Sequence, residues 1–287
     1  MLTKIGLIVN TGKKQPIQLG KDLLHWCESR GISVYTTAED GSILGADKNC
    51  ITEDIGKNVD CIVTLGGDGT ILRAARITAA SEVPILGVNL GVLGFLTEIE
   101  VPEIYDAMDK LVREEYYLEN RMMLDGCLKN KRNQTNFIGL NDFVVKGPLA
   151  RLIIVDVFVN EQYVTTYNGD GIIISSPTGS TAYSLSAGGP IIHPEVEAII
   201  ITPICPHTLH ARPLVIPSEK VVRIRIKKAH ADSMMTIDGQ QVYTVEKNDE
   251  IYISASQKQT RLVRIKNRNF FEILQEKMKT EGRISYE

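Results

Sequence analysis

The chain has 287 residues, of which 43% are hydrophobic, and a formal net charge of −3 at pH 7. This length fits one large or two ordinary domains, and the slightly acidic balance gives no electrostatic basis for binding nucleic acid or an anionic membrane. No apolar stretch is long enough to span a bilayer. Because the first residues already enter a strand pattern, we expect no signal peptide. The five cysteines form no Cys-x-x-Cys pair, so we expect reduced thiols in a cytoplasmic protein rather than a disulfide framework or a zinc site.

Strand and helix patterns alternate in the first part of the chain. Short apolar runs predict strands at 4–9, 32–35, 61–65 and 84–88. Apolar residues recur at helical spacing over 19–27, and Pro102 opens another helical pattern. Such alternation implies a parallel sheet with right-handed crossovers. We therefore predict that residues 1–118 form a Rossmann-like parallel α/β domain.

The pattern changes after Tyr116. Apolar, β-rich runs separated by Asn, Gly, Pro and Asp now predict strands at 143–145, 152–159, 171–175, 221–226 and 251–253. Few helical patterns interrupt them, so residues 119–268 are predicted to form a C-terminal antiparallel β-sandwich domain. An amphipathic pattern from Phe270 to Met278 predicts a last helix, and residues 269–287 are expected to pack back on the first domain.

A glycine turn follows the third predicted strand, with the sequence Gly66-Gly67-Asp68-Gly69-Thr70. In a parallel α/β sheet, ligands bind at the carboxyl ends of the strands, and glycines let the backbone approach a phosphate closely. The helix that follows offers free N–H groups to an anion. The turn is predicted to hold the phosphate donor through Gly66, Gly67, Gly69 and Thr70. Asp68 is either a reactive acid in this turn or a cap of the helix that follows.

The segment from Asn168 to Pro190 is rich in glycine and hydroxyl side chains. Ser and Thr hydroxyls donate and accept hydrogen bonds, so they suit ribose, amide and phosphate groups. Asp170 stands between two glycines and suits a sugar hydroxyl or an amide, and Tyr183 can stack on a heterocycle. An ordinary Ser/Gly loop has a similar composition, but the density of hydroxyl groups and the framing by Pro177 favour a nucleotide site.

These two segments resemble the NAD kinase (ATP-NAD kinase) family. The resemblance rests on Gly66–Thr70 and Ser176–Pro190 and extends to 91–97, 140–142 and 206–214, so it covers most of the chain. The first motif is shared with lipid kinases, whereas the second is highly specific. The resemblance implies a two-domain phosphotransferase with an alcohol group as acceptor, assembled as a homodimer or homotetramer. Its reaction places the terminal phosphate of ATP, or of another phosphoryl donor, on the 2′-hydroxyl of the adenosine ribose of NAD to make NADP.

The resemblance also implies roles for individual residues. Asp68 matches the family's general base, and Gly69 lies beside it against the dinucleotide. Asn141 and Asp142 match a pair that is usually Asn-Glu and contacts the adenine side, and the shorter acid here reduces the reach of the carboxylate. Phe95 matches an apolar contact to the base. The remaining positions that match dinucleotide contacts are Asp170, Thr181, Ala182, Tyr183, Ser184, Leu185, Ser186, Arg73, Arg151 and Gln240.

Two chemical roles remain open for Asp68. It can accept the proton of the 2′-hydroxyl as a general base, or it can orient that hydroxyl, because phosphoryl transfer passes through a loose transition state. The chain has no Walker-type motif and no Gly-x-Gly-x-x-Gly. We therefore expect glycine-turn amides, basic side chains and a divalent metal, Mg²⁺ carried with ATP rather than in a protein cage, to hold the donor phosphates. Arg73 either neutralises phosphate charge or is a solvated helix residue. His207 and His210 are interpreted as structural.

Two other functions compete with this one. A lipid kinase with the same glycine turn needs an apolar slot and a membrane-facing basic surface, and a dinucleotide sensor binds NAD without transferring phosphate. Basic residues that alternate with apolar ones occur at 223–227 and 261–266. This period of two is typical of the solvated face of a strand, and we favour that interpretation over a nucleic-acid stripe.

Overall fold

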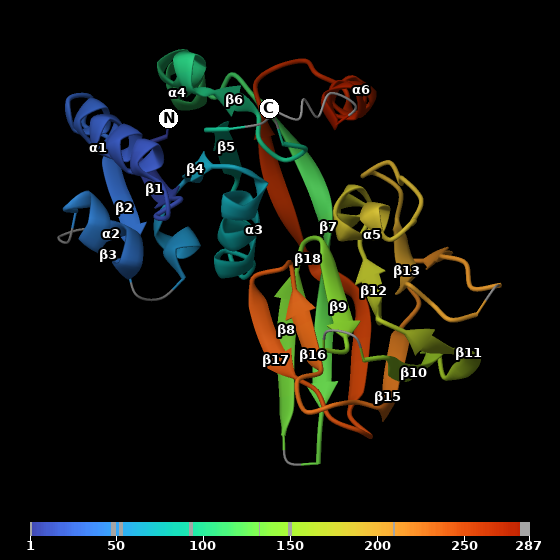
Figure 1. Ribbon diagram of the computed structural model, residues 1–287. Helices are drawn as coiled ribbons and strands as arrows, with labels where there is room; N and C mark the ends of the chain where they lie inside the picture. Colours follow the sequence, from blue (N-terminus) through green and yellow to red (C-terminus); the bar gives the residue numbers. More distant parts are fainter. Residues whose placement is uncertain are drawn as a thin grey trace, which may run out of the picture. The chain divides into compact units, whose positions relative to one another are not determined.

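The computed structural model describes residues 2–46, 50–51, 54–91, 94–131, 133–148, 151–208 and 210–281. The chain forms two compact units (Figure 1). Unit 1 comprises Met1–Asn120 and Thr260–Glu287, and unit 2 comprises Arg121–Gln259. Parts of three predicted segments, at 92–93, 209 and 282–287, lie outside the described residues.

Unit 1 contains a parallel sheet. Its strands are β1 (Lys4–Val9), β2 (Ser33–Thr37), β3 (Cys50–Ile51), β4 (Cys61–Gly66), β5 (Ile85–Asn89) and β6 (Ile99–Glu100). β3, β2, β1, β4 and β5 lie side by side in this order and all neighbours run parallel. β5 also pairs in parallel with β6 and with the end of β18 (Glu250–Arg264). Every residue of β4 and β5 is buried, which explains their largely apolar sequences.

Among the residues that the structure describes, five α-helices belong to unit 1. They are α1 (Lys14–Glu28), α2 (Ala38–Leu44), α3 (Asp68–Ile77), α4 (Ile104–Val112) and α6 (Phe270–Glu281). α4 follows a short 3₁₀ turn, Val101–Glu103, whose start is closed by a capping box between Glu100 and Glu103. α2 was not predicted from the sequence. Thr37 caps its first turn and Gly45 ends it with a φ of 74°.

Unit 2 consists of antiparallel strands in two sheets. In the first sheet, β11 (Gln162–Gly169), β10 (Ile153–Val159), β15 (Val222–Lys228) and β18 lie in this order. In the second, the order is β14 (Leu214–Pro217), β13 (Ala198–Ile204), β12 (Gly171–Ser175), β9 (Asp142–Lys146), β16 (Met234–Ile237) and β17 (Gln241–Thr244). β7 (Tyr117–Lys129) forms an antiparallel pair with β8 (Gln134–Gly139).

The two sheets of unit 2 share one hydrophobic core. Val155 and Ile224 from the first sheet are buried in the same cluster as Phe143, Ile172 and Ile201 from the second. This packing of two antiparallel sheets is a β-sandwich. The predicted fold class, a parallel α/β domain followed by an antiparallel β domain, is confirmed.

The basic residues of β15 differ from their predicted environment. Arg223 is only 6% exposed, and its guanidinium lies 2.7 Å from a Glu161 oxygen and 2.9 Å from a Glu250 oxygen. It also stacks 3.8 Å from the centre of the Phe158 ring. Arg225 shares Glu250 at 3.0 Å. The interpretation as a solvated face is therefore wrong for Arg223, because acidic and aromatic side chains of neighbouring strands cover it.

Candidate active site

The glycine turn of unit 1 lines a cavity of about 520 Å³. The turn joins β4 to α3, so the N-terminus of α3 lies at the carboxyl end of a central strand. All four residues predicted to hold the phosphate donor line this cavity, namely Gly66, Gly67, Gly69 and Thr70. Lys13 and Arg73 add basic side chains to its wall. The cavity therefore combines backbone N–H groups, a hydroxyl and two cations, a composition that suits a polyphosphate.

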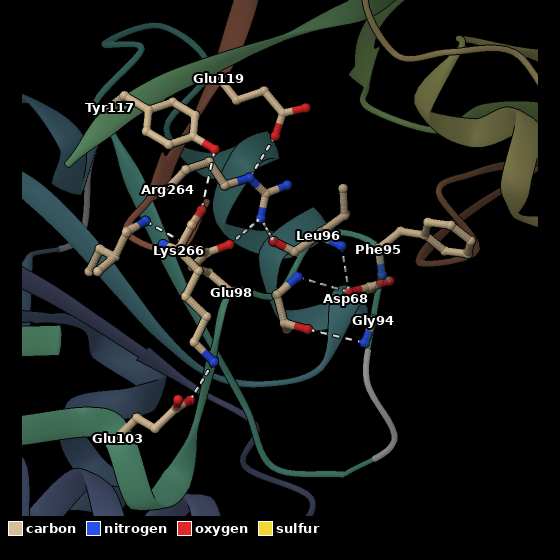
Figure 2. Close-up of polar contacts among 12 residues, drawn as sticks. Asp68, Gly94, Phe95, Leu96, Glu98, Glu103, Tyr117, Glu119, Arg264 and Lys266 are labelled. Carbon is tan, nitrogen blue, oxygen red and sulfur yellow. Dashed lines mark hydrogen bonds and ion pairs between the residues drawn. The ribbon is translucent and has the colours of Figure 1, made fainter. Parts of the chain in front are cut away.

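Asp68 is the first residue of α3, but its carboxylate does not cap this helix. Gly67 is the N-cap, and no side chain accepts a hydrogen bond there. The carboxylate instead accepts backbone N–H bonds from Phe95 at 2.8 Å, Leu96 at 3.1 Å and Thr97 at 3.3 Å (Figure 2). The capping alternative from the sequence is therefore wrong, although backbone N–H groups do fix this acid.

The turn over residues 94–97 approaches Asp68 closely because it begins with a glycine. A Cβ atom at Gly94 would overlap the Asp68 carboxylate. The turn is closed by Thr97, whose hydroxyl accepts the Gly94 N–H at 3.1 Å. A carboxylate has about four lone-pair positions, and these three N–H groups occupy Oδ1 twice and Oδ2 once. Among the described residues, this arrangement leaves one acceptor position on Oδ2.

Phe95 packs beside the C-terminal helix of unit 1. Its ring centre lies 6.3 Å from that of Phe270, and the Lys277 ammonium lies 5.9 Å from the ring centre. Both partners belong to α6. Phe95 thus presents a half-buried aromatic surface directly after the turn that fixes Asp68.

Arg73 is held in the cavity wall by a buried acid. Its two terminal nitrogens lie 3.1 and 3.0 Å from the two carboxylate oxygens of Asp40, and Asp40 is 0% exposed. Glu39 adds a contact at 3.1 Å, and the Val9 carbonyl adds one at 3.3 Å. The interpretation of Arg73 as a solvated helix residue is therefore wrong. Asp40 was missed by the sequence analysis because its burial depends on α2.

A second set of predicted residues lies in unit 2, at the start of β9. The backbone N–H groups of Leu140, Asn141 and Asp142 all donate to the carboxylate of Asp238, at 2.9, 2.7 and 3.1 Å. Asp238 has a φ of 52° in the turn between β16 and β17, and its own N–H donates to the Asp142 carbonyl at 3.0 Å. This exchange fixes the Asn141-Asp142 turn. Gln240 follows two residues later and is exposed.

The hydroxyl-rich segment also fixes the Asn141-Asp142 turn, by donating hydrogen bonds to main-chain carbonyls of Leu140 and Asn141. The Ser176 hydroxyl donates to the Leu140 carbonyl at 2.6 Å, and the Ser176 N–H donates to the Asn141 carbonyl at 2.9 Å. A Cβ atom at Gly179 would overlap the Asn141 backbone, so this position requires glycine. The side-chain oxygen Oδ1 of Asn141 is buried, with no hydrogen-bond partner in the described part of the chain. A buried acceptor normally has a hydrogen-bond partner, and a ligand donor or an ordered water can supply it.

Asp142 is buried next to Asp238, with 4% of its surface exposed. Burial, and to a lesser extent the charge of Asp238, raises the pKa of Asp142 from 3.8 to about 7. Both causes disfavour the ionised form. Near neutral pH, the carboxyl group of Asp142 is therefore protonated in part of the molecules, and it can then donate as well as accept a hydrogen bond.

The remaining predicted residues of unit 2 differ in exposure. Asp170 is exposed at the point where the chain passes from β11 to β12. Tyr183 is 42% exposed, and its pKa is raised by partial burial and by the nearby charges of Cys205, Asp170 and Asp142. Ser184 is 0% exposed, and its hydroxyl lies 2.8 Å from that of Thr202.

The other predicted contacts occupy two short segments. Thr178–Thr181 forms a 3₁₀ turn that continues through Ala182 into α5 (Tyr183–Ser186), where Leu185 is half-buried and Ser186 is exposed. Arg151 is exposed, and its N–H donates to the Pro148 carbonyl at 3.1 Å. Across the residues that the structure describes, no three His, Cys, Asp or Glu side chains gather in a way that could hold a metal ion.

An α/β unit with a glycine-lined cavity at the carboxyl ends of its parallel strands defines a nucleotide-binding protein. Comparison with known proteins specifies the family. The ATP-NAD kinase N-terminal domain matches residues 5–116, and the ATP-NAD kinase C-terminal domain matches residues 140–265. The chain belongs to the ATP-NAD kinase family, as the sequence resemblance indicated, and this family consists of phosphotransferases with an alcohol group as acceptor.

Individual relatives match most of the chain. The NAD kinase of Caldanaerobacter subterraneus subsp. tengcongensis is 44% identical over 280 residues, which cover 96% of this chain and 99% of the relative. The NAD kinase of Carboxydothermus hydrogenoformans is 49% identical over 229 residues, or 79% of this chain and 82% of the relative.

Two solved structures have the same fold. An NAD kinase from Archaeoglobus fulgidus in complex with ATP aligns with a TM-score of 0.73 at 25% identity, over 96% of this chain and 99% of that one. Yeast NADH kinase in complex with NADH aligns with a TM-score of 0.87 at 24% identity, over 100% of this chain and 90% of that one. No helix in the described residues has both the length and the apolar character to cross a bilayer.

Proposed function

We propose that this protein transfers the terminal phosphoryl group of ATP to the 2′-hydroxyl of the adenosine ribose of NAD. Family membership supports this reaction, and neither a lipid kinase nor a dinucleotide sensor has support among the relatives. The observation that carries the proposal is the state of Asp68. Its carboxylate is fixed by three N–H groups and keeps one acceptor position, and Asp68 is in sequence flanked by Gly67 and Gly69, which both line the cavity.

The donor phosphates bind in the cavity beside the glycine turn. Backbone N–H groups at the start of α3 and the Thr70 hydroxyl face phosphate oxygens, and Lys13 and Arg73 balance their charge. Mg²⁺ would arrive on the phosphate oxygens of ATP and would neutralise part of their charge there.

Asp68 acts on the acceptor hydroxyl. Its remaining acceptor position on Oδ2 receives the 2′-hydroxyl hydrogen and orients the oxygen toward the γ-phosphorus. The ribose oxygen forms the new bond to phosphorus, the bond to the bridging oxygen of ADP breaks, and the hydroxyl proton passes to the Asp68 carboxylate. Once Asp68 has released this proton to solvent, its carboxylate repels the new 2′-phosphate, and this repulsion promotes release of NADP.

The adenosine portion of NAD binds to the turn at the start of β9. The unpartnered Oδ1 of Asn141 accepts the exocyclic amino group of adenine. Asp142 bonds the adjacent ring nitrogen when its carboxyl group is protonated. Asp170, exposed between two strands, binds an amide or a sugar hydroxyl, and Tyr183 stacks on a ring. Phe95 and Gly69 also contact the dinucleotide. Further contacts come from the exposed or half-buried residues within 181–186, from Arg151 and from Gln240.

Further features complete this proposal. The domains have boundaries near 118 and 268, with the last helix joined to the first domain. The protein works in the cytoplasm as a homo-oligomer, a dimer or tetramer. In the described part of the chain, Cys27, Cys61, Cys127 and Cys205 form no disulfide, as is usual for a protein of a reducing compartment.

The test is NADP formation from NAD and Mg-ATP, measured with an NADP-specific dehydrogenase. We expect turnover by the wild type and a loss of about 10²–10⁴-fold in kcat for Asp68→Asn. Asp22→Asn, an exposed aspartate of α1, is the matched control and keeps the wild-type rate. NAD binding without NADP formation by the wild type would instead identify a sensor, and phosphorylation of diacylglycerol in vesicles would identify a lipid kinase.

A binding measurement tests the repulsion between the Asp68 carboxylate and the 2′-phosphate. Asp68→Asn should bind NADP more tightly than the wild type, and equal affinity would exclude this repulsion.

A further inference from the structure

A buried ion pair stands behind the turn that fixes Asp68. Arg264, at the end of β18, is 4% exposed, and Glu98 is 5% exposed. The Arg264 Nη1 lies 3.1 Å from a Glu98 oxygen, and the Arg264 Nε lies 2.6 Å from a Glu119 oxygen (Figure 2). All these residues belong to unit 1. The sequence pattern predicted a solvated strand face here, and that interpretation is wrong for Arg264.

The same Nη1 atom also donates to the main-chain carbonyl of Leu96, at 3.2 Å. This carbonyl and the N–H of Thr97 belong to one planar peptide group, and that N–H donates to Asp68 Oδ1 at 3.3 Å. Arg264 is therefore connected to the Asp68 carboxylate through a single rigid peptide. A cation on the carbonyl polarises the peptide and strengthens the bond from its N–H.

Glu98 directly follows the turn and connects it to the residues after β18. Its second oxygen accepts the backbone N–H groups of Ile265 at 3.0 Å and Lys266 at 2.6 Å. Its own N–H donates to the Gly87 carbonyl of β5 at 2.9 Å. The turn is thus attached at one side to the parallel sheet and at the other to the end of β18.

Stability alone does not account for this arrangement. A buried ion pair is often no more stabilising than apolar residues of the same volume, because both charges lose their hydration. Arg264 is placed where a guanidinium can satisfy two carboxylates and one carbonyl at once, which a lysine ammonium or an apolar side chain cannot do.

We propose that Arg264 is a positioning residue for phosphoryl transfer, which orients the Leu96–Thr97 peptide so that the Asp68 carboxylate faces the acceptor hydroxyl. This role rests on the proposed function. Arg264 does not touch the substrates. It acts through the peptide. Its loss therefore lowers the rate of the chemical step and leaves the affinity for NAD and ATP unchanged.

The test is Arg264→Lys in the assay of NADP formation. We expect kcat to fall about tenfold to hundredfold, since a small misplacement of a reacting group has an effect of that size, while both KM values stay within about twofold. Lys266→Met is the matched control. It removes the ion pair with Glu103 but keeps the backbone N–H to Glu98, so its kcat stays within about twofold of wild type.

A double-variant comparison separates positioning from general support of the fold. In an Asp68→Asn background, Arg264→Lys should leave the residual kcat unchanged, because the carboxylate that it positions is gone. An equal factor of loss in both backgrounds, or a rise in KM at constant kcat, would overturn the proposal.

Folding is checked by circular dichroism and the melting temperature. If Arg264→Lys does not fold, Glu119→Gln carries the test, because Glu119 is partly exposed and its change leaves the Glu98 pair in place. It should lower kcat by about threefold without moving either KM, and an unchanged kcat would overturn the proposal. A wild type that makes no NADP refutes the proposed function, whereas an active wild type with fully active variants refutes only the role of Arg264.

Discussion

Asp142 links the stability of this protein to pH in an unusual direction. The unfolded chain releases the proton of this carboxyl near pH 3.8, whereas the folded protein keeps it until its pKa of about 7. Between these values the folded state binds more protons than the unfolded state, so the contribution of Asp142 to the free energy of unfolding falls as the pH rises. The loss is complete above about pH 7.

The perturbation is Asp142→Asn, which keeps the shape of the protonated acid and cannot ionise. The rise of the pKa from 3.8 to about 7 corresponds to roughly 4 kcal/mol at most. The variant should therefore be more stable than the wild type by up to roughly 4 kcal/mol at pH 8, and the difference should shrink toward zero near pH 4.

The assay is urea unfolding at several pH values between 4 and 8, followed by far-ultraviolet circular dichroism. The one tryptophan of the chain is Trp26 in unit 1, so its fluorescence does not report on unit 2. Asp125→Asn, an exposed aspartate of β7, serves as the control and should track the wild type. A constant difference between Asp142→Asn and wild type over this pH range would refute the reasoning.

Two further variants test the binding sites. Asp238→Ala leaves three backbone N–H groups without their acceptor, so it should raise the KM for NAD and lower stability by about 2–3 kcal/mol, with the KM for ATP unchanged. An unaltered KM for NAD in steady-state kinetics would show that the turn holds its shape without this acid. Arg73→Met should raise the KM for ATP, and it should also destabilise the protein by about 3–5 kcal/mol because it leaves Asp40 buried and unpaired. Adding Asp40→Asn should restore thermal stability but not the KM for ATP, and recovery of both would show that Arg73 has only a structural role.

The regular part of the fold was predictable from local sequence. β4 and β12 are short runs of apolar residues buried on both faces, and their boundaries match the predicted strands within one residue. The glycine turn after β4 was predictable for the same reason, because glycines directly after a buried strand are rare outside such turns. α2 escaped prediction since it has only seven residues and contains a glycine, Gly41, in its middle.

The contacts that orient the site could not be predicted. Asp238 accepts N–H bonds from residues nearly 100 positions earlier, with a separation of 98 to Leu140. Arg264 and Glu98 are 166 residues apart. No local pattern distinguishes these charged residues from solvated ones, because their burial is a property of the assembled strands. Arg223 shows the same effect, since its alternation with apolar neighbours predicted exposure and its partners on β18 and in the turn before β11 reverse it.

Unit 1 is discontinuous in sequence, and this has a consequence for biosynthesis. The hydrogen bond from Arg264 to Leu96 spans 168 residues, and β5 acquires its neighbour Leu262 only when the end of β18 is available. The whole of unit 2 therefore leaves the ribosome before Leu262 can pair with β5 and before Arg264 can anchor the turn next to Asp68. An unfinished nascent chain holds this acid without its support, so we expect the chemical activity to emerge only at the end of translation.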